Sequence, residues 1–171
     1  MKRFQLDDTA VILIDHQVGT NTWATSTPLA LLQRNVVILA RFAAGVGLPV
    51  VLTSSQETNV DAQGPLMPQL REVLPEAFAD ACRRTGRKNF VMAGVTTDVC
   101  MVGPAISAVA EGFDVQVVAD ACGSSSRIAE DMSYRRMALG GVRLTSTNAI
   151  VAELVRDWAT PAGAVAFPLL T

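Results

Sequence analysis

Thr9–Asp15 reads TAVILID, an apolar run that ends in a carboxylate. Strands that are buried on both faces, as in parallel sheets, have unbroken apolar runs of this length that are rich in Val and Ile. Similar runs recur along the chain at Pro49–Ser55, Asn89–Val95, Asp114–Ala121 and, in shorter form, Val142–Thr147. We therefore expect these segments to be the strands of one buried sheet.

Helix-like stretches separate the apolar runs, and glycines mark where several of them end. They cover Leu29–Val46, Pro68–Thr85, Asp98–Glu111, Ser126–Gly140 and Thr147–Trp158. Regular alternation of strand and helix predicts an α/β protein with a doubly wound, mainly parallel sheet and helices on both faces. We expect a single domain over residues 1–171, with a loop at Val18–Pro28 and a tail at Thr160–Thr171 that packs on a neighbouring subunit or frays.

Composition excludes several classes of function. The net charge is −2, and the two lysines, Lys2 and Lys88, lie outside any basic run, which argues against nucleic acid and anionic membranes as partners. No apolar run is long enough for a membrane span, and the N-terminus does not resemble a signal peptide. Three cysteines without metal-type spacing and a single histidine predict no metal site and a reducing, cytoplasmic location.

In doubly wound sheets the ligand crevice lies beyond the carboxyl ends of the strands. One such end reads Gly94-Val95-Thr96-Thr97-Asp98-Val99-Cys100. We expect Cys100 in the first turn of the next helix, with Thr97 or Asp98 as its N-cap. The helix dipole and free N–H groups would favour the thiolate, and the N–H groups around Val95, Thr96 and Cys100 could hold a developing oxyanion.

Asp15 follows the first strand directly. The point where the winding of the sheet reverses would bring it near Cys100, where it could take the thiol proton or pass a proton to a leaving amine. The alternatives are a carboxylate that only caps a turn and a cysteine that only fills the core. Low-ranking candidates for the pocket lining are His16, Gln17, Trp23 and Gln56.

The sequence resembles the isochorismatase-like cysteine hydrolases, and within them the YcaC-like branch of bacterial hydrolases. The resemblance runs from about Asp8 to Trp158 and rests on VILIDHQ, PVVLTSS, AGVTTDVC and EGFDVQVVADA. It implies an Asp–Lys–Cys triad in which Asp15 is the acid and Cys100 the nucleophile. It also implies a cis peptide bond at Val95–Thr96 and a homo-oligomer. The metal-dependent branch of the family needs more histidines than His16.

The triad lysine of that family has no counterpart here, and the chain is shorter than its relatives between the second and third strands. Lys88 precedes the Asn89 strand and should lie at the wrong end of the sheet. Either a segment is missing from the sequence near Glu76–Ala79, or the deletion is real and the pocket lacks a wall.

The chain lacks the glycine motifs of dinucleotide and nucleotide sites, so we expect no cofactor. The expected function is hydrolysis of a small amide, or another substrate with a carbonyl–nitrogen bond, by Cys100 and Asp15. The alternative is a catalytically silent oligomeric protein that keeps the fold, which the missing lysine favours.

Overall fold

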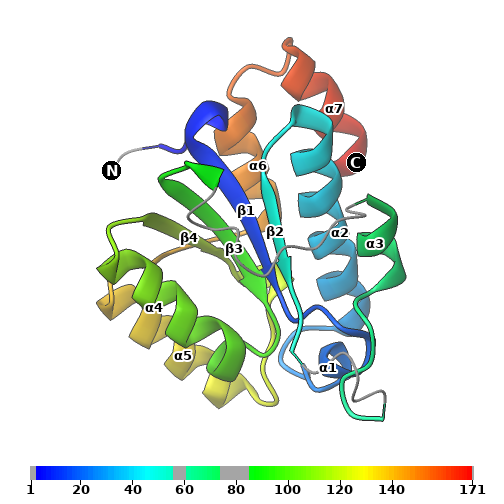
Figure 1. Ribbon diagram of the computed structural model, residues 1–171, viewed down its shortest axis with the longest axis vertical. Helices are drawn as coiled ribbons and strands as arrows, with labels where there is room; N and C mark the ends of the chain where they lie inside the picture. Colours follow the sequence, from blue (N-terminus) through cyan, green and yellow to red (C-terminus); the bar gives the residue numbers. More distant parts are fainter. Residues whose placement is uncertain (1–2, 56–60, 74–84, 171) are drawn as a thin grey trace.

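Five strands form one parallel sheet in the order β2-β1-β3-β4-β5 (Figure 1). The computed structural model describes residues 3–55, 61–73 and 85–170; Gln56, Cys82 and the segment Glu76–Ala79 lie outside these residues. The strands are β1 (Thr9–Ile14), β2 (Val50–Thr53), β3 (Asn89–Gly94), β4 (Asp114–Val118) and β5 (Arg143–Thr145). All five expected strands are thus confirmed, and all pair in parallel.

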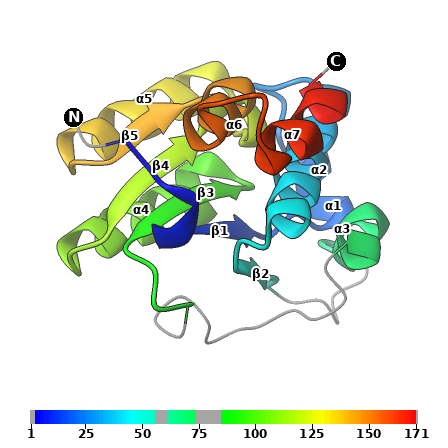
Figure 2. The same ribbon diagram turned by 90° about the horizontal axis from the view of Figure 1, so that it is seen from above.

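The helices cover both faces of the sheet. They are α1 (Val18–Thr22), α2 (Leu29–Val46), α3 (Pro68–Val73), α4 (Val102–Ala110), α5 (Arg127–Leu139), α6 (Thr147–Val155) and α7 (Pro161–Leu170). In Figures 1 and 2, α4 and α5 lie on one face, and α2, α6 and α7 lie on the other. This is the doubly wound arrangement that the sequence predicts.

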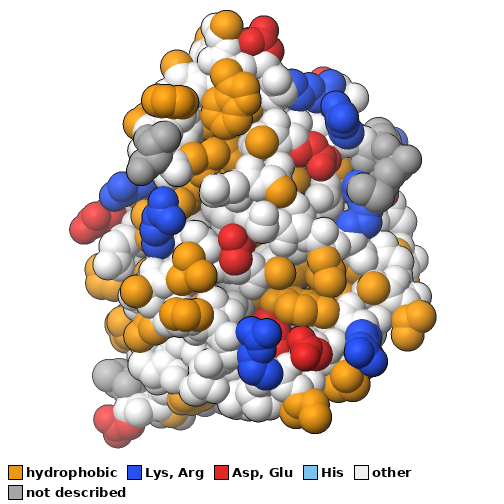
Figure 3. Space-filling view, turned by 180° about the vertical axis from the view of Figure 1, so that it is seen from behind, with side chains coloured by type: hydrophobic (Ala, Val, Ile, Leu, Met, Phe, Trp, Pro, Cys, Tyr) orange, Lys and Arg blue, Asp and Glu red, His pale blue; other side chains and the backbone are white. Residues whose placement is uncertain are grey.

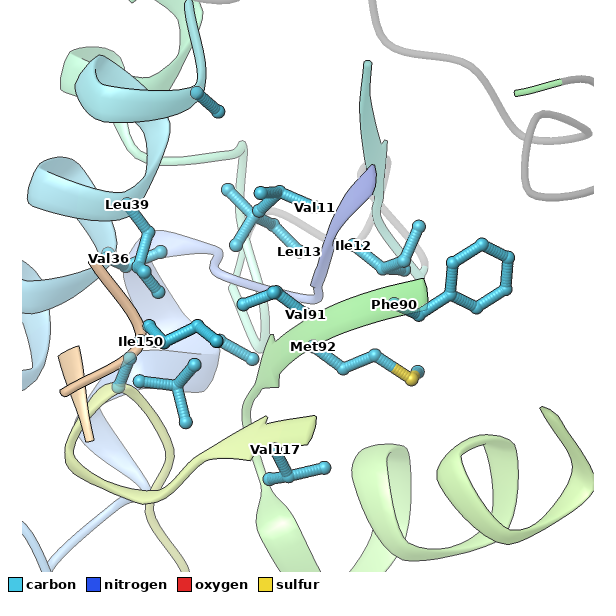
Figure 4. Packing of buried hydrophobic residues seen from close by; sticks show 14 of the residues in the cluster. Val11, Ile12, Leu13, Val36, Leu39, Phe90, Val91, Met92, Val117 and Ile150 are labelled. Atoms are coloured by element: carbon cyan, nitrogen blue, oxygen red, sulfur yellow. The ribbon is translucent and has the colours of Figure 1, made fainter. Parts of the chain in front are cut away.

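The core lies on both sides of β1 and β3, whose side chains alternate between the two faces (Figure 4). Figure 4 shows Val11, Leu13 and Val91 directed toward α2 and α6, where they meet Val36, Leu39 and Ile150. Ile12, Phe90 and Met92 point to the face that α4 covers. Burial on both faces explains why these strands are apolar without alternation.

Helix α2 matches its predicted bounds, and Gly47 ends it in the left-handed conformation with φ 73°. By length and composition alone, α2 is the one described helix that could cross a membrane, with mean hydropathy 1.4. It packs on β1, β2, α6 and α7, which is the position of a core helix.

Two expectations about irregular segments are wrong. The predicted loop Val18–Pro28 begins with α1. The first two N–H groups of this helix donate to the carbonyls of Pro65 and Gln63. These contacts come from a distant segment, so local periodicity could not reveal them. The predicted tail is helix α7, which packs on α2 and buries Gly163 and Ala166, so it does not fray, whereas its packing on a neighbouring subunit stays a prediction. Pro161 at its first position suits a helix start.

The contact between α2 and α7 gives the first prediction. A Cβ at Gly45 would lie 2.6 Å from Val165 Cγ1, whereas a Cβ at Gly103 in α4 would meet nothing within 4 Å. We expect Gly45→Ala to destabilise the protein by about 1–3 kcal/mol through overpacking. Gly103→Ala should stabilise it by about 0.5–1 kcal/mol, because alanine favours helix.

Thermal unfolding of both variants measures these effects. If Gly45→Ala raised the melting temperature as Gly103→Ala does, α7 would not be docked on α2.

Candidate active site

Asp15 and Cys100 meet where β1 and β3 end. Ile14 pairs with Gly94, and the Val95 N–H donates to the Ile14 carbonyl over 3.1 Å. This pairing places the residues after both strands side by side, close enough for the Asp15 carboxylate to raise the pKa of the Cys100 thiol. Asp15 is 6% exposed and has a left-handed backbone with φ 54°. The ends of β1 and β3 thus lie side by side, as the topology predicts, and the catalytic roles of Asp15 and Cys100 stay predictions.

The Cys100 turn (Thr97–Met101) is π-helical, and α4 begins only at Val102. The Thr96 carbonyl accepts hydrogen bonds from the N–H groups of Val99, Cys100 and Met101, at 3.3, 2.8 and 3.3 Å. The peptide bond Val95–Thr96 is cis, as the resemblance implies. The expected N-cap at Thr97 or Asp98 is wrong, because Thr96 occupies that position and caps through no side chain.

Burial raises the pKa of the Cys100 thiol to about 11, together with the hydrogen bond to Asp15 and the negative charge of Asp15. Asp98 adds to this effect, while a hydrogen bond from the Thr96 backbone N–H to the sulfur lowers the pKa. The expectation that the turn favours the thiolate is therefore wrong in direction. Two nearby carboxylates and desolvation outweigh the favourable backbone contact.

Close packing fixes the Cys100 turn against β1. A Cβ at Gly94 would lie 2.8 Å from Met101 Cγ and 2.9 Å from Ile14 Cβ, so only glycine fits there without displacement. The Val95 side chain is fully buried in a small cluster with Ala24 and Leu32. Val95 thus contributes its backbone to the site, and its side chain anchors the turn.

His16 and Gln17 are both fully buried. Burial lowers the pKa of His16 to about 4, partly offset by the Asn21 side chain and the Ala93 backbone. Neither ring nitrogen makes a hydrogen bond of ordinary geometry in the structure. The Gln17 amide donates to the Gly64 carbonyl over 2.5 Å and accepts from the Ser55 N–H over 3.2 Å. It therefore ties three segments together, and a role for either residue in substrate binding stays a prediction.

Trp23 follows α1 and is 43% exposed, while Gln56 lies outside the described residues. Asp120 has the turn role that its position indicates, because its carboxylate accepts from the Thr147 N–H and hydroxyl at 2.8 and 2.9 Å. Cys122 is a buried free thiol, as expected of a core residue. Within the part of the chain that the structure describes, no group of three His, Cys, Asp or Glu side chains could hold a metal ion.

Sequence reasoning missed two carboxylates. Asp98 acts on the Cys100 thiol, and its place two residues before the cysteine was a usable signal. Glu130 binds the Thr97 hydroxyl at 3.2 Å across 33 residues of sequence, and no local pattern could have shown this contact.

Lys88 lies directly before β3, at the amino end of a strand whose carboxyl end leads to the Cys100 turn. Its N–H donates to the Asp8 carboxylate over 3.1 Å. The length of β3, about 20 Å for its six residues, separates Lys88 from the Cys100 turn. Lys88 is not a substitute for the triad lysine, as its sequence position indicates.

Comparison with known proteins now adds to this geometry. The family model described as Isochorismatase domain matches residues 74–149, which include the Cys100 turn. The probable hydrolase YcaC of Escherichia coli is 36% identical over 91% of this chain and 82% of the relative. This chain belongs to the isochorismatase family. It is a hydrolase of the YcaC-like branch.

Two solved structures support the same conclusion for the whole fold. The Escherichia coli YcaC structure, described as an octameric hydrolase of unknown specificity, matches with a TM-score of 0.91 and 34% identity over 99% of this chain and 91% of that chain. YcaC from Pseudomonas aeruginosa, with hexane-2,5-diol and covalent acrylamide, matches with a TM-score of 0.89 and 36% identity over 96% of this chain and 90% of that chain.

The Escherichia coli relative is longer than this chain within the aligned region. The alignment extends over 172 residues, whereas 91% of this chain is about 156 residues, which leaves about 16 positions without a residue here. This agrees with the expectation that relatives are longer. The expected site of the difference, Glu76–Ala79, lies outside the described residues.

The raised pKa of Cys100 gives the second prediction. Alkylation by iodoacetamide should accelerate about tenfold per pH unit above pH 7 and level off only near pH 11, because the thiolate is the reactive form. Asp15→Asn should lower the pKa and accelerate alkylation at pH 8, since it removes a negative charge. Asp98→Asn should do the same more weakly.

Mass spectrometry of the Cys100 peptide measures these rates without interference from other thiols. Asp114→Asn is the matched control, because Asp114 begins β4 at the other end of the sheet. A rate that is already maximal below pH 7 would contradict the raised pKa.

Proposed function

We propose that the protein hydrolyses a small amide through Cys100 as nucleophile and Asp15 as general base and acid. The observation that carries this proposal is the proximity of the Cys100 thiol and the Asp15 carboxylate at the switch point of the sheet, where β1 and β3 end side by side. A raised thiol pKa keeps the proton on sulfur in the resting enzyme. The neighbouring carboxylate then removes this proton as the sulfur attacks.

The reaction proceeds in two halves. The Cys100 sulfur bonds to the amide carbon while its proton passes to Asp15, which gives a tetrahedral oxyanion. The carbon–nitrogen bond then breaks, Asp15 returns the proton to the leaving amine, and a thioester remains. Water, deprotonated by Asp15, attacks the thioester and releases the carboxylic acid and the free thiol. Backbone N–H groups at Thr96 and Cys100 are the proposed oxyanion donors.

Both proposed donors already interact with other groups in the free protein. The Thr96 backbone acts on the Cys100 sulfur by lowering the thiol pKa, and the Cys100 N–H donates to the Thr96 carbonyl over 2.8 Å. As the sulfur becomes bonded to carbon, the negative charge develops on the substrate oxygen, and the sulfur stays uncharged. The Thr96 N–H can then serve the oxyanion, which carries the charge.

A small amide suits the chemistry as a substrate class. The structure of the Pseudomonas aeruginosa relative contains covalent acrylamide, which supports access of molecules of this size, although acrylamide adds to nucleophiles at its carbon–carbon double bond and keeps its amide. The basic side chains in Figure 3 are scattered among acidic ones on that face, and the net charge is −2, which supports small molecules rather than nucleic acid as ligands. We also infer a reducing, cytoplasmic location, because Cys100 and Cys122 are both free thiols.

The third prediction tests turnover against a panel of small aliphatic and aromatic amides, with ammonia release as the signal. Cys100→Ala should abolish turnover, and Asp15→Asn should reduce kcat by about 100-fold or more, because base catalysis contributes about 10²–10⁴-fold. The same Asp15→Asn change should accelerate alkylation of Cys100. Opposite effects on the two reactions distinguish a proton acceptor from a residue that merely holds the turn.

If no amide of the panel is hydrolysed and Cys100 is alkylated only at high pH, the result would instead support the catalytically silent alternative. Two observations favour this alternative: the raised pKa of the Cys100 thiol, and the position of Lys88 before β3, away from the Cys100 turn.

We further propose that the chain forms a homo-oligomer, because the Escherichia coli relative is octameric. The fourth prediction is a mass near eight times 18.1 kDa in light scattering after size exclusion. Exposed apolar side chains such as Ile128 and Leu139 on α5 and Phe167 on α7 are available to such contacts. A monomer at micromolar concentration would contradict this proposal.

A further inference from the structure

We propose that Glu130 is a positioning residue for the Cys100 turn: it holds the turn through the Thr97 hydroxyl and the loop before α2 through Ser26. The inference rests on the proposed reaction at Cys100, but it concerns a carboxylate outside the Asp15–Cys100 pair. Glu130 lies in the first turn of α5 and is only 5% exposed.

Three hydroxyl groups donate to the Glu130 carboxylate. The Thr97 hydroxyl lies 3.2 Å from both oxygens, and the Ser26 hydroxyl lies 2.9 Å from Oε2. The Tyr134 hydroxyl contacts Oε1 and also lies 3.0 Å from the Ala119 carbonyl. A buried carboxylate is costly unless its oxygens are hydrogen-bonded, and here both are. The network is therefore specific in geometry.

The donors come from different parts of the fold. Ser26 precedes α2, Thr97 opens the Cys100 turn, and Tyr134 belongs to α5 itself. The Ser26 hydroxyl also accepts the Ser124 N–H over 2.8 Å, and the Thr97 N–H donates to the Gly123 carbonyl over 2.9 Å. Glu130 thus joins two segments that flank the site to one rigid helix.

Thr97 adjoins the residue that controls the sulfur. The carbonyl of its neighbour Thr96 accepts three N–H groups of the turn, and the Thr96 backbone lowers the pKa of the Cys100 thiol. When the hydrogen bond from the Thr97 hydroxyl to the Glu130 carboxylate is lost, the orientation of Thr96 is no longer fixed from the side of α5. The group that stabilises a negative sulfur is then lost in part, while Asp15 and Asp98 still oppose the thiolate.

Thr97→Val tests this step, because valine keeps the shape of threonine and removes the hydroxyl donor. We expect the apparent pKa of Cys100 in alkylation to rise, so that the rate at pH 9 falls about threefold or more. We expect kcat to fall about 10- to 100-fold with KM nearly unchanged, as for small displacements of a reacting group. Thr97→Ser, which restores the hydroxyl, should recover both readouts.

Glu130→Gln should show the same pattern in milder form, because its one amide oxygen can still accept from Thr97 or Tyr134. Thr97→Val and Glu130→Gln combined should change the alkylation pKa by less than the sum of the single effects, since both act on the contact between Thr97 and Glu130. The matched control is Glu153→Gln. Glu153 accepts from the Phe4 N–H and the Gln116 amide, at 2.8 and 3.0 Å, and should change only the melting temperature.

The alkylation readout does not require turnover, so it tests Glu130 even if no amide is hydrolysed. If the Thr97→Val variant kept the wild-type pKa of Cys100 alkylation and the wild-type kcat, the inference would be overturned. A Glu130→Gln variant that, like Glu153→Gln, loses only thermal stability would also overturn it.

Discussion

The pairing of β1 with β3 is the constraint on which the site depends. From β1 the chain winds to β2 on one side, and after β3 it winds to β4 and β5 on the other. The two central strands therefore end next to each other with no helix between their carboxyl ends. The register Ile14–Gly94 sets which residues meet there, and a shift by one residue would turn Asp15 away from the Cys100 turn. Gly94 permits this contact because its missing side chain leaves room for Met101.

Electrostatics in the site oppose the thiolate rather than support it. Families with a positively charged third member can stabilise sulfur as an anion before substrate arrives. Among the residues that the structure describes, the charged groups that act on the Cys100 thiol are the carboxylates of Asp15 and Asp98, and the Thr96 backbone acts in the other direction. In the reaction proposed for Cys100, the proton moves during attack, because burial and the nearby carboxylates keep the resting thiol protonated. The cost of moving the proton is then paid only in the transition state.

Most of the architecture could be predicted from the sequence because strands buried on both faces leave an unmistakable apolar run. The Asp15–Cys100 contact was predictable for the same reason, since topology alone brings those strand ends together. The protonation of Cys100 was not, because it depends on how deeply the turn is buried and on the placement of Asp98. Helix α1 and the Glu130 contacts depend on partners far along the chain, and α7 depends on the surface of α2. Short-range patterns carry no information about such partners.

Thr96 serves the site through both ends of its backbone, with its N–H facing the sulfur and its carbonyl gathering the N–H groups of the turn. The hydrogen bonds of Thr96 described for the turn are made by its backbone and not by its side chain. At this position the turn is held by backbone groups, which every residue type supplies, so these hydrogen bonds do not depend on the chemistry of the side chain. Only 8% of Thr96 is exposed, so the space around it, and not its hydrogen bonding, limits which side chains fit there.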